Sequence, residues 1–155
     1  MYYLEKGKDL DLNYLAQVLL QFQTKELPQF NKYRKYYDGK QKILQKQIVE
    51  GKPCNRVIVN YCYNITQSYQ GYITGIPITY ESEDFENILK VLNYNDTPTE
   101  DSEYLKNALI YGRAFEVNYI DEEGRQRFRL FDTRECVPIY ENTLECPLLY
   151  VVRFY

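Results

Sequence analysis

The spacing of the apolar residues changes once along the chain, and that change constrains the fold more than any other feature. Up to Gly112 the apolar side chains recur every three or four residues, as on one face of an α-helix. From Arg113 onward they alternate with polar ones, which is the period of a half-buried strand. Helices first and strands afterwards predict an α+β fold, with four to five N-terminal helices packed on an antiparallel β-meander.

Start and stop signals place these helices more closely. The residues expected to cap or open them are Asp11, Pro28, Asn55, Ser82 and Thr99. Glycines are expected to end helices or shape turns at Gly39, Gly75, Gly112 and Gly124. The faces expected to be buried are Leu12, Leu15, Leu19 and Phe22; Phe30, Tyr33 and Tyr37; Ile58, Tyr61, Cys62, Ile65, Tyr69 and Tyr72; Phe85, Ile88, Leu89 and Leu92; and Leu105, Ala108 and Leu109.

The strands are predicted from alternation between turn signals. A hairpin is expected around residues 121–124, with Phe115 and Val117 on the same face as Phe128 and Leu130. If those four residues form the loop, Glu116 opposes Arg129; a two-residue loop at Glu123-Gly124 keeps the faces and shifts the partners. Further strands are expected at residues 136–140, 148–155 and 76–80, and a short strand or extended loop at 40–54.

The residue types that are missing exclude most catalytic chemistry. The chain has no histidine, which removes Ser-His-Asp and Cys-His catalysis and most zinc sites. Neither Gly-Lys pair has the flanking residues of a phosphate-binding loop, and the four cysteines, expected to be reduced, show no C-x-x-C spacing. We therefore expect no catalytic residue, no cofactor and no metal. An enzyme that uses Asp132 and Glu135 with a divalent metal stays an alternative.

Charge and tyrosine content indicate contacts with other molecules. The chain carries a net charge of −3, yet residues 25–56 contain nine basic and three acidic residues. Such a segment suits phosphate contacts, a solvated helix face or docking on an acidic neighbouring subunit. The 18 tyrosines serve either as core filler or in interfaces. The candidate contacts with DNA or a subunit are Lys32, Arg34, Lys35, Lys40, Lys42, Arg125, Arg127 and Arg129.

No apolar run is long enough to span a membrane, and the first residues lack the apolar region of a signal peptide. These features predict a soluble, non-secreted protein. One alternative assignment is a small nucleic-acid-binding module that uses the basic segment 25–56.

Six short motifs follow one another along most of the chain. They are YYDGKQKI at 36–43, NRVIVNY at 55–61, GYITGIPITY at 71–80, ALIYGRAFE at 108–116, FDTRECVPIY at 131–140 and VRFY at 152–155. In order and spacing the series resembles the N-terminal part of the portal proteins of long-tailed bacteriophages and prophages of Gram-positive bacteria. The resemblance divides the chain into an N-terminal helix at 1–27 and part of the portal wing domain at 28–155, helical to about residue 112.

The resemblance implies a structural subunit of a ring, usually a dodecamer, at the portal vertex of the virion head, assembled in the host cytoplasm. Double-stranded DNA passes through such a ring during packaging and ejection, and the ring nucleates the capsid and seats the head-tail connector. The implied partners are other portal subunits, terminase, capsid or scaffolding proteins and head-tail adaptors, with no membrane. Portal proteins are much longer, and their stem, clip and crown have no counterpart here, so we expect an N-terminal fragment.

Overall fold

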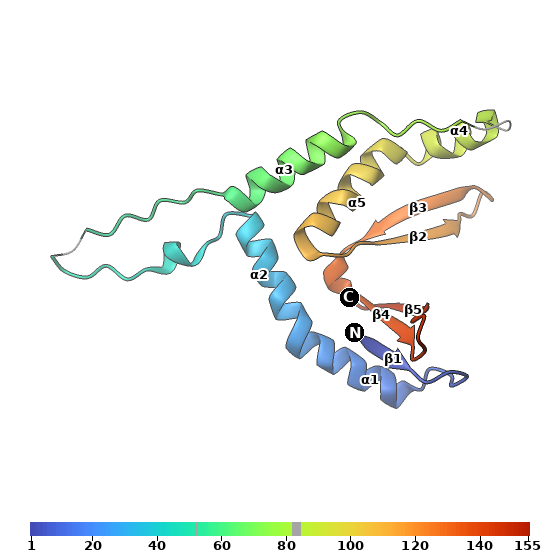
Figure 1. Cartoon of the computed structure of the whole chain (residues 1–155), viewed down its shortest axis with the longest axis horizontal. Helices are drawn as coiled ribbons and strands as arrows, with labels where there is room; N and C mark the ends of the chain where they lie inside the picture. The colour runs from blue at the N-terminus through green and yellow to red at the C-terminus, as the bar shows by residue number, and fades with distance from the viewer. Residues whose placement is uncertain (52, 82–84) are drawn as a thin grey trace.

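The structure is a computed structural model that describes residues 1–51, 53–81 and 85–155. The helices are α1 (Leu12–Gln21), α2 (Leu27–Tyr37), α3 (Tyr61–Thr74), α4 (Phe85–Tyr94) and α5 (Thr97–Tyr111). The strands are β1 (Tyr2–Leu4), β2 (Phe115–Ile120), β3 (Gln126–Phe131), β4 (Cys136–Glu141) and β5 (Leu148–Arg153). The strands lie in the angle between α1–α2 and α3–α5 (Figure 1). The predicted α+β class is confirmed.

The first two helices are halves of one bent helix. Between them Phe22–Glu26 forms a π-helical turn, in which the Leu27 N–H donates to the Phe22 carbonyl. Pro28 has no N–H to donate and lies in the first turn of α2, as its position in the sequence predicts. Widening the turn before the proline lets the backbone stay helical while it bends. The domain boundary expected between residues 27 and 28 thus lies within helical backbone, and it stays a prediction.

The core lies between this bent helix and β4. Phe22 and three residues of β4 (Cys136, Val137 and Ile139) have no exposed surface. The Phe22 ring lies 5.6 Å from the Phe154 ring in an edge-on arrangement. The face predicted for α1 is partly wrong, since Leu12 is 79% exposed and Val18 is buried. The inward stripe runs instead through positions 14, 18 and 22, which are spaced by four residues.

The strands form two small sheets, which corrects the predicted single meander. Among the described strands, β2 and β3 pair with each other alone, while β4 lies between β1 and β5. β4 and β5 are antiparallel, and β1 runs parallel to β4, with Tyr2 opposite Ile139. No strand was predicted at residues 2–4, because three residues are too few to show alternation. The burial of Tyr2 and Leu4 nevertheless ties the N-terminus to the core.

The β2–β3 hairpin has neither of the two predicted registers. Phe115 pairs with Phe131 and Val117 with Arg129, so Glu116 opposes Leu130 and not Arg129. The Asp121 N–H donates to the Arg125 carbonyl, which leaves a three-residue loop that ends at Gly124 with φ +76°. A three-residue loop shifts the pairing by one position relative to loops of two or four residues. Phe128 and Leu130 therefore lie on the other face from Phe115 and Val117.

Helix α3 begins at Tyr61, later than the sequence predicts, and it buries a different face from the predicted one. Its N-cap is Asn60, whose side chain accepts from the Tyr63 N–H, and not Asn55. The predicted inward face is exposed, with Ile65 at 56% and Tyr72 at 91%. The side that packs against α5 is polar: the Gln70 side-chain amide donates to the Ser102 hydroxyl at 2.8 Å. Hydrogen bonds to α5 on this polar side therefore help to orient α3.

Expectations for the segments around α3, α4 and α5 are partly corrected. Residues 76–80 form no paired strand, and α5 starts at Thr97, ahead of the expected cap Thr99. Gly39 and Gly112 have the left-handed backbone expected of them, with φ +74° and +77°. Gly75 ends α3 as predicted, but its backbone is right-handed, and a Cβ there would collide with the Gly71 carbonyl. Leu109, expected to be buried, is 39% exposed, and the expected cap Ser82 lies outside the described residues.

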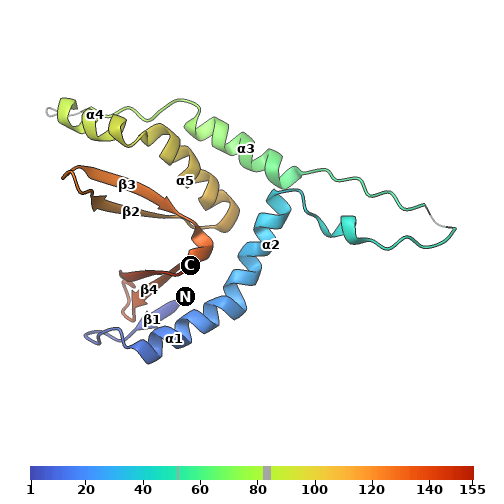
Figure 2. The same cartoon turned by 180° about the vertical axis from the view of Figure 1, so that it is seen from behind.

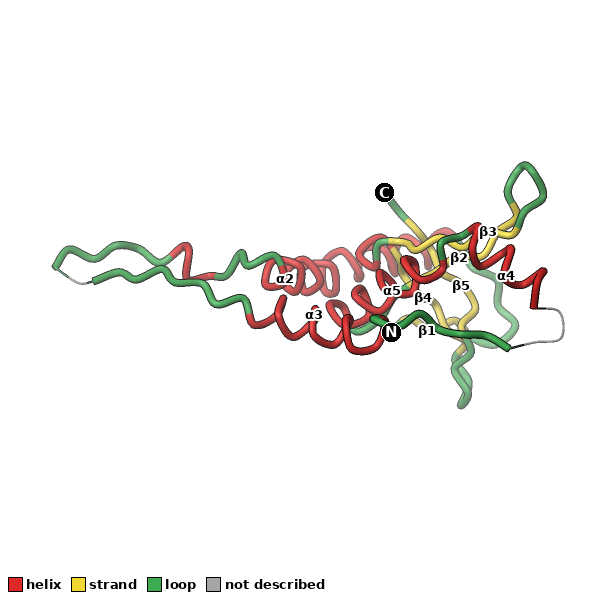
Figure 3. The backbone as a smooth tube through the Cα atoms, turned by 90° about the horizontal axis from the view of Figure 1, so that it is seen from above, coloured by secondary structure: helices red, strands yellow, loops and turns green. Residues whose placement is uncertain are grey.

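Residues 40–51 and 53–59 leave the body as the two limbs of a long arm that runs out and back (Figure 2). Apart from one short 3-10 turn at Lys42–Gln45, the described part of this arm has no regular structure, which agrees with the predicted extended loop. Its two limbs are joined by the Arg56 guanidinium, which donates to the Lys46 carbonyl at 2.7 Å. Seen from above, the arm extends from the end of the molecule where α2 and α3 lie, away from the strands (Figure 3).

Candidate functional site

Four predicted contact residues meet in one cleft, which we call the lysine groove: Lys32, Lys35, Lys40 and Lys42. It has a volume of about 470 Å³ and is also lined by Leu27, Pro28, Asn31, Tyr36 and Gln45, among others. Helix α2 places Lys32 and Lys35 three residues apart and so on one side. The left-handed turn at Gly39 then folds Lys40 and Lys42 back beside them. None of the ion pairs among the described residues includes these four lysines.

Arg34 lies on the same helix but has a structural role. Its guanidinium pairs with Asp38 at 3.0 Å and lies over the Tyr37 ring, 5.6 Å from the ring centroid. These contacts hold the last turn of α2. We therefore separate Arg34 from the lysine groove, although the sequence groups it with the four lysines.

The three candidate arginines of the β2–β3 hairpin, Arg125, Arg127 and Arg129, also differ in their contacts. Arg125 and Arg127 both lie over the Tyr94 ring, at 4.4 and 4.2 Å from its centroid, and both pair with Asp121. Hydrogen bonds from the backbone and side chain of Arg125 lower the pKa of Asp121, so this carboxylate stays charged. The two arginines thus fasten the hairpin to α4. Arg129 is exposed and opposite Val117, and the ion pairs among described residues do not include it.

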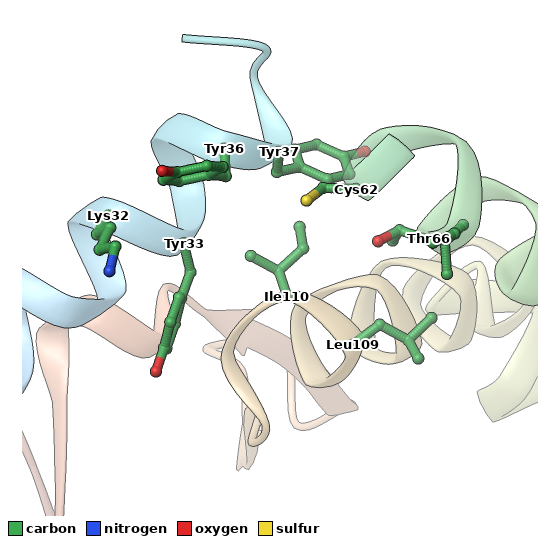
Figure 4. A pocket seen from close by; sticks show the side chains of 9 residues that line it. Lys32, Tyr33, Tyr36, Tyr37, Cys62, Thr66, Leu109 and Ile110 are labelled. Atoms are coloured by element: carbon green, nitrogen blue, oxygen red, sulfur yellow. The ribbon is translucent and has the colours of Figure 1, made fainter. Parts of the chain in front are cut away.

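A second cleft was not predicted from the sequence, and we call it the tyrosine groove. Side chains of α2, α3 and α5 surround about 480 Å³, with Tyr33 and Tyr36 facing Ile110 and Leu109 across it (Figure 4). Tyr37, Cys62, Ile65, Thr66 and Lys32 complete its lining. Its signal in the sequence is the tyrosine spacing on α2, which by itself predicts a buried face. Its aromatic and aliphatic walls suit an apolar side chain from a partner better than a phosphate.

The carboxylates considered for a metal site are already paired. Asp132 is bound by the Arg134 guanidinium at 2.5 Å, and Glu135 by that of Arg153 at 3.0 Å. Burial opposes the charged form of Asp132, yet the hydrogen bonds from Arg134 lower the pKa of this carboxyl. Within the ranges that the structure describes, no cluster of Asp, Glu or Cys could hold a metal ion. These contacts favour a structural role for both acids, as partners of arginines.

The cysteines form no pair in the structure. Cys136, which begins β4, is buried and opposite Arg153, whereas Cys146 is exposed in the turn before β5. Burial raises the pKa of the Cys136 thiol to about 11, so it stays protonated and unreactive at neutral pH.

Comparison with known proteins gives the family directly. The family model described as "Phage portal protein, SPP1 Gp6-like" matches residues 17–155. The chain belongs to this phage portal protein family. No curated protein matched the chain.

Membership in the portal family relates the exposed apolar surfaces of this chain to a structural role. Portal proteins are structural components of the virion head, not a family of enzymes. Among the described residues, no helix of this portal protein is long and apolar enough to cross a membrane. The apolar side of α3 and the tyrosine groove are the kind of surface that a subunit of an assembly presents to its neighbours.

Proposed function

We propose that this chain is the N-terminal part of the wing domain of a portal subunit. In this proposal the subunit forms a ring, usually dodecameric, through which double-stranded DNA is packaged and ejected. The ring nucleates the capsid and seats the head-tail connector, and its partners are terminase, capsid or scaffolding proteins and head-tail adaptors. The observation that carries the proposal is the family match over residues 17–155.

The distribution of apolar surface supports an assembly protein. Exposed large side chains run along α3 at Tyr61, Ile65, Tyr69 and Tyr72, each more than half exposed. Burial of apolar surface contributes about 25 cal/mol per Å², so covering such a face by a neighbour stabilises a complex. A heterologous contact between identical subunits generates a ring when the rotation closes. The chain itself has a mechanical role in this proposal, and ATP hydrolysis belongs to the terminase.

The experiment is to induce phage particles from the strain that carries the gene and to purify them on a density gradient. Quantitative mass spectrometry of the particles should find peptides of residues 1–155 at a low, fixed ratio to the major capsid protein. Their complete absence from intact, DNA-filled particles would contradict the proposal.

A second function is favoured by one observation, the convergence of Lys32, Lys35, Lys40 and Lys42 in the lysine groove. Four clustered cations could contact the phosphates of DNA that passes the subunit, or make the chain a nucleic-acid-binding module by itself. Binding of duplex DNA should then fall steeply with salt, and replacement of all four lysines by Gln should flatten that dependence. Replacement of Lys25 and Lys90, which are exposed elsewhere, is the matched control. No DNA binding at low salt would exclude this second function.

A further inference from the structure

The arm exposes apolar side chains that the described part of its own chain leaves uncovered. Ile48 is 74% exposed, Val57 70% and Val49 55%, and Ile43, Leu44, Ile58 and Val59 are each more than a third exposed. The segment also has five basic residues against one acid, Glu50: Lys40, Lys42, Lys46, Lys52 and Arg56. A projecting segment that is both aliphatic and basic needs an acceptor that is both apolar and acidic.

The body of the molecule offers such an acceptor on another side. A cleft of about 370 Å³ lies between α5, β2 and β5, lined by Asp101, Tyr104, Ala114, Phe115, Glu116, Leu148 and Val151. Tyr104, Leu148 and Val151 are each about 40–50% exposed, so its walls are open apolar surface. No basic side chain lines it, unlike the lysine groove and the tyrosine groove.

Asp101 and Glu116 line this cleft, Glu100 is the neighbour of Asp101 in the sequence, and no salt bridge between described residues neutralises these three acids. Glu100, Asp101 and Glu116 take part in none of the ion pairs among the described residues. The pKa of Glu116 is raised by its burial and by the negative charges of Asp101 and Glu100. A cation from another molecule would relieve this repulsion.

The arm cannot fill the cleft of its own chain. It leaves the body beyond α2 and α3, whereas β2 and β5 lie on the opposite side of those helices (Figures 1 and 3). We propose that the arm of one copy docks into the α5–β2–β5 cleft of the next copy. Donor and acceptor are different surfaces of one chain, so the contact is head-to-tail and can close into a ring. This inference rests on the proposed ring.

A second copy fits the arm better than DNA does. Seven exposed aliphatic side chains gain nothing from phosphates, but they gain from a cleft walled by Tyr104, Leu148 and Val151. The lysine groove, which lies at the root of the arm, is the better candidate for a phosphate contact.

The contact can be tested by photo-crosslinking of the whole chain. A benzophenone amino acid at position 48, in the arm, should yield crosslinked dimers whose link maps to peptides containing Tyr104 or residues 148–151. The same probe at position 72, exposed on α3, is the control and should not label that cleft. Links from position 48 only to other surfaces, or only to an added DNA duplex, would overturn the inference.

Charge reversal gives an independent measurement. Lys46→Glu should weaken self-association about tenfold in sedimentation, and Glu116→Lys in the same chain should restore much of it. Lys90→Glu, on the exposed side of α4, is the matched control and should leave association unchanged. If Lys46→Glu has no effect, or if the chain is monomeric at every concentration, the arm contact is wrong. The content of phage particles would still decide the proposed function, so the two failures can be told apart.

Discussion

Two parts of the molecule use their apolar residues in opposite ways. Around β4, the bent helix and β1 bury Phe22, Val137 and Ile139 completely. In α3 and the arm, residues of equal hydrophobicity such as Ile65 and Val57 are more than half exposed. The closed part is a core that folding alone completes. The open part has the apolar composition of a core but is exposed to solvent. A subunit has such a surface when a partner covers it in the assembly.

The sharpest way to test this contrast is to truncate one aromatic ring in each part. Phe22→Ala should lower the free energy of unfolding by about 3–5 kcal/mol, because a fully buried ring leaves a cavity. Tyr72→Ala, at a 91% exposed site on α3, should change it by less than about 0.5 kcal/mol. Denaturant titration of both variants measures the difference. Equal losses would mean that α3 is covered within its own chain.

The joint between the bent helix and β2 is the next most sensitive place. Arg113 pairs with Glu26 at 2.8 Å and lies 4.7 Å from the centroid of the Phe30 ring. Removing it by Arg113→Ala should cost about 1–3 kcal/mol, since Glu26 is half-buried and loses its partner. A double-mutant cycle with Glu26→Gln isolates the pair. A coupling energy near zero would show that packing alone holds this joint.

Two glycines should respond to substitution with opposite sign. Gly112 ends α5 with φ +77°, so Gly112→Ala should destabilise the chain by about 1 kcal/mol. Gly71 lies inside α3 with open space around its Cβ position, so Gly71→Ala should stabilise it by up to about 1 kcal/mol. Thermal melting measures both. A destabilising Gly71→Ala would indicate that this side of α3 is packed against something.

The smallest expected effect is a pH dependence of stability that comes from Glu116, in the α5–β2–β5 cleft. The pKa of Glu116 is raised above its ordinary value of 4.5 by burial and by Asp101 and Glu100. The folded chain therefore binds this proton more tightly than the unfolded chain, and stability decreases as pH rises from about 4.5 through the folded pKa. Glu116→Gln should remove that decrease and leave stability below pH 4.5 unchanged. Denaturant midpoints across this pH range measure it, and parallel curves for both chains would contradict the assignment.

The contact residues show how far the sequence predicts a site. Clustered lysines around Gly39 are a local signal, because a left-handed turn brings neighbours in sequence together, and Lys32, Lys35, Lys40 and Lys42 do meet. Arg125 and Arg127 give the same charge signal but are used internally. What separates them is Tyr94, a residue distant in sequence that only the tertiary structure places under both guanidinium groups.

By itself, the sequence determined the α+β class, the positions of most helices and strands, and the order of motifs typical of portal proteins. These features depend on periodicity and turn residues within a few positions of one another. The tertiary structure alone decided which side of α3 is buried, because Gln70 finds Ser102 in α5. It also decided the hairpin register, through a three-residue loop, and the parallel pairing of β1 with β4. Each of these depends on which alternative partner yields the lower free energy, and local patterns of hydrophobicity do not carry that information.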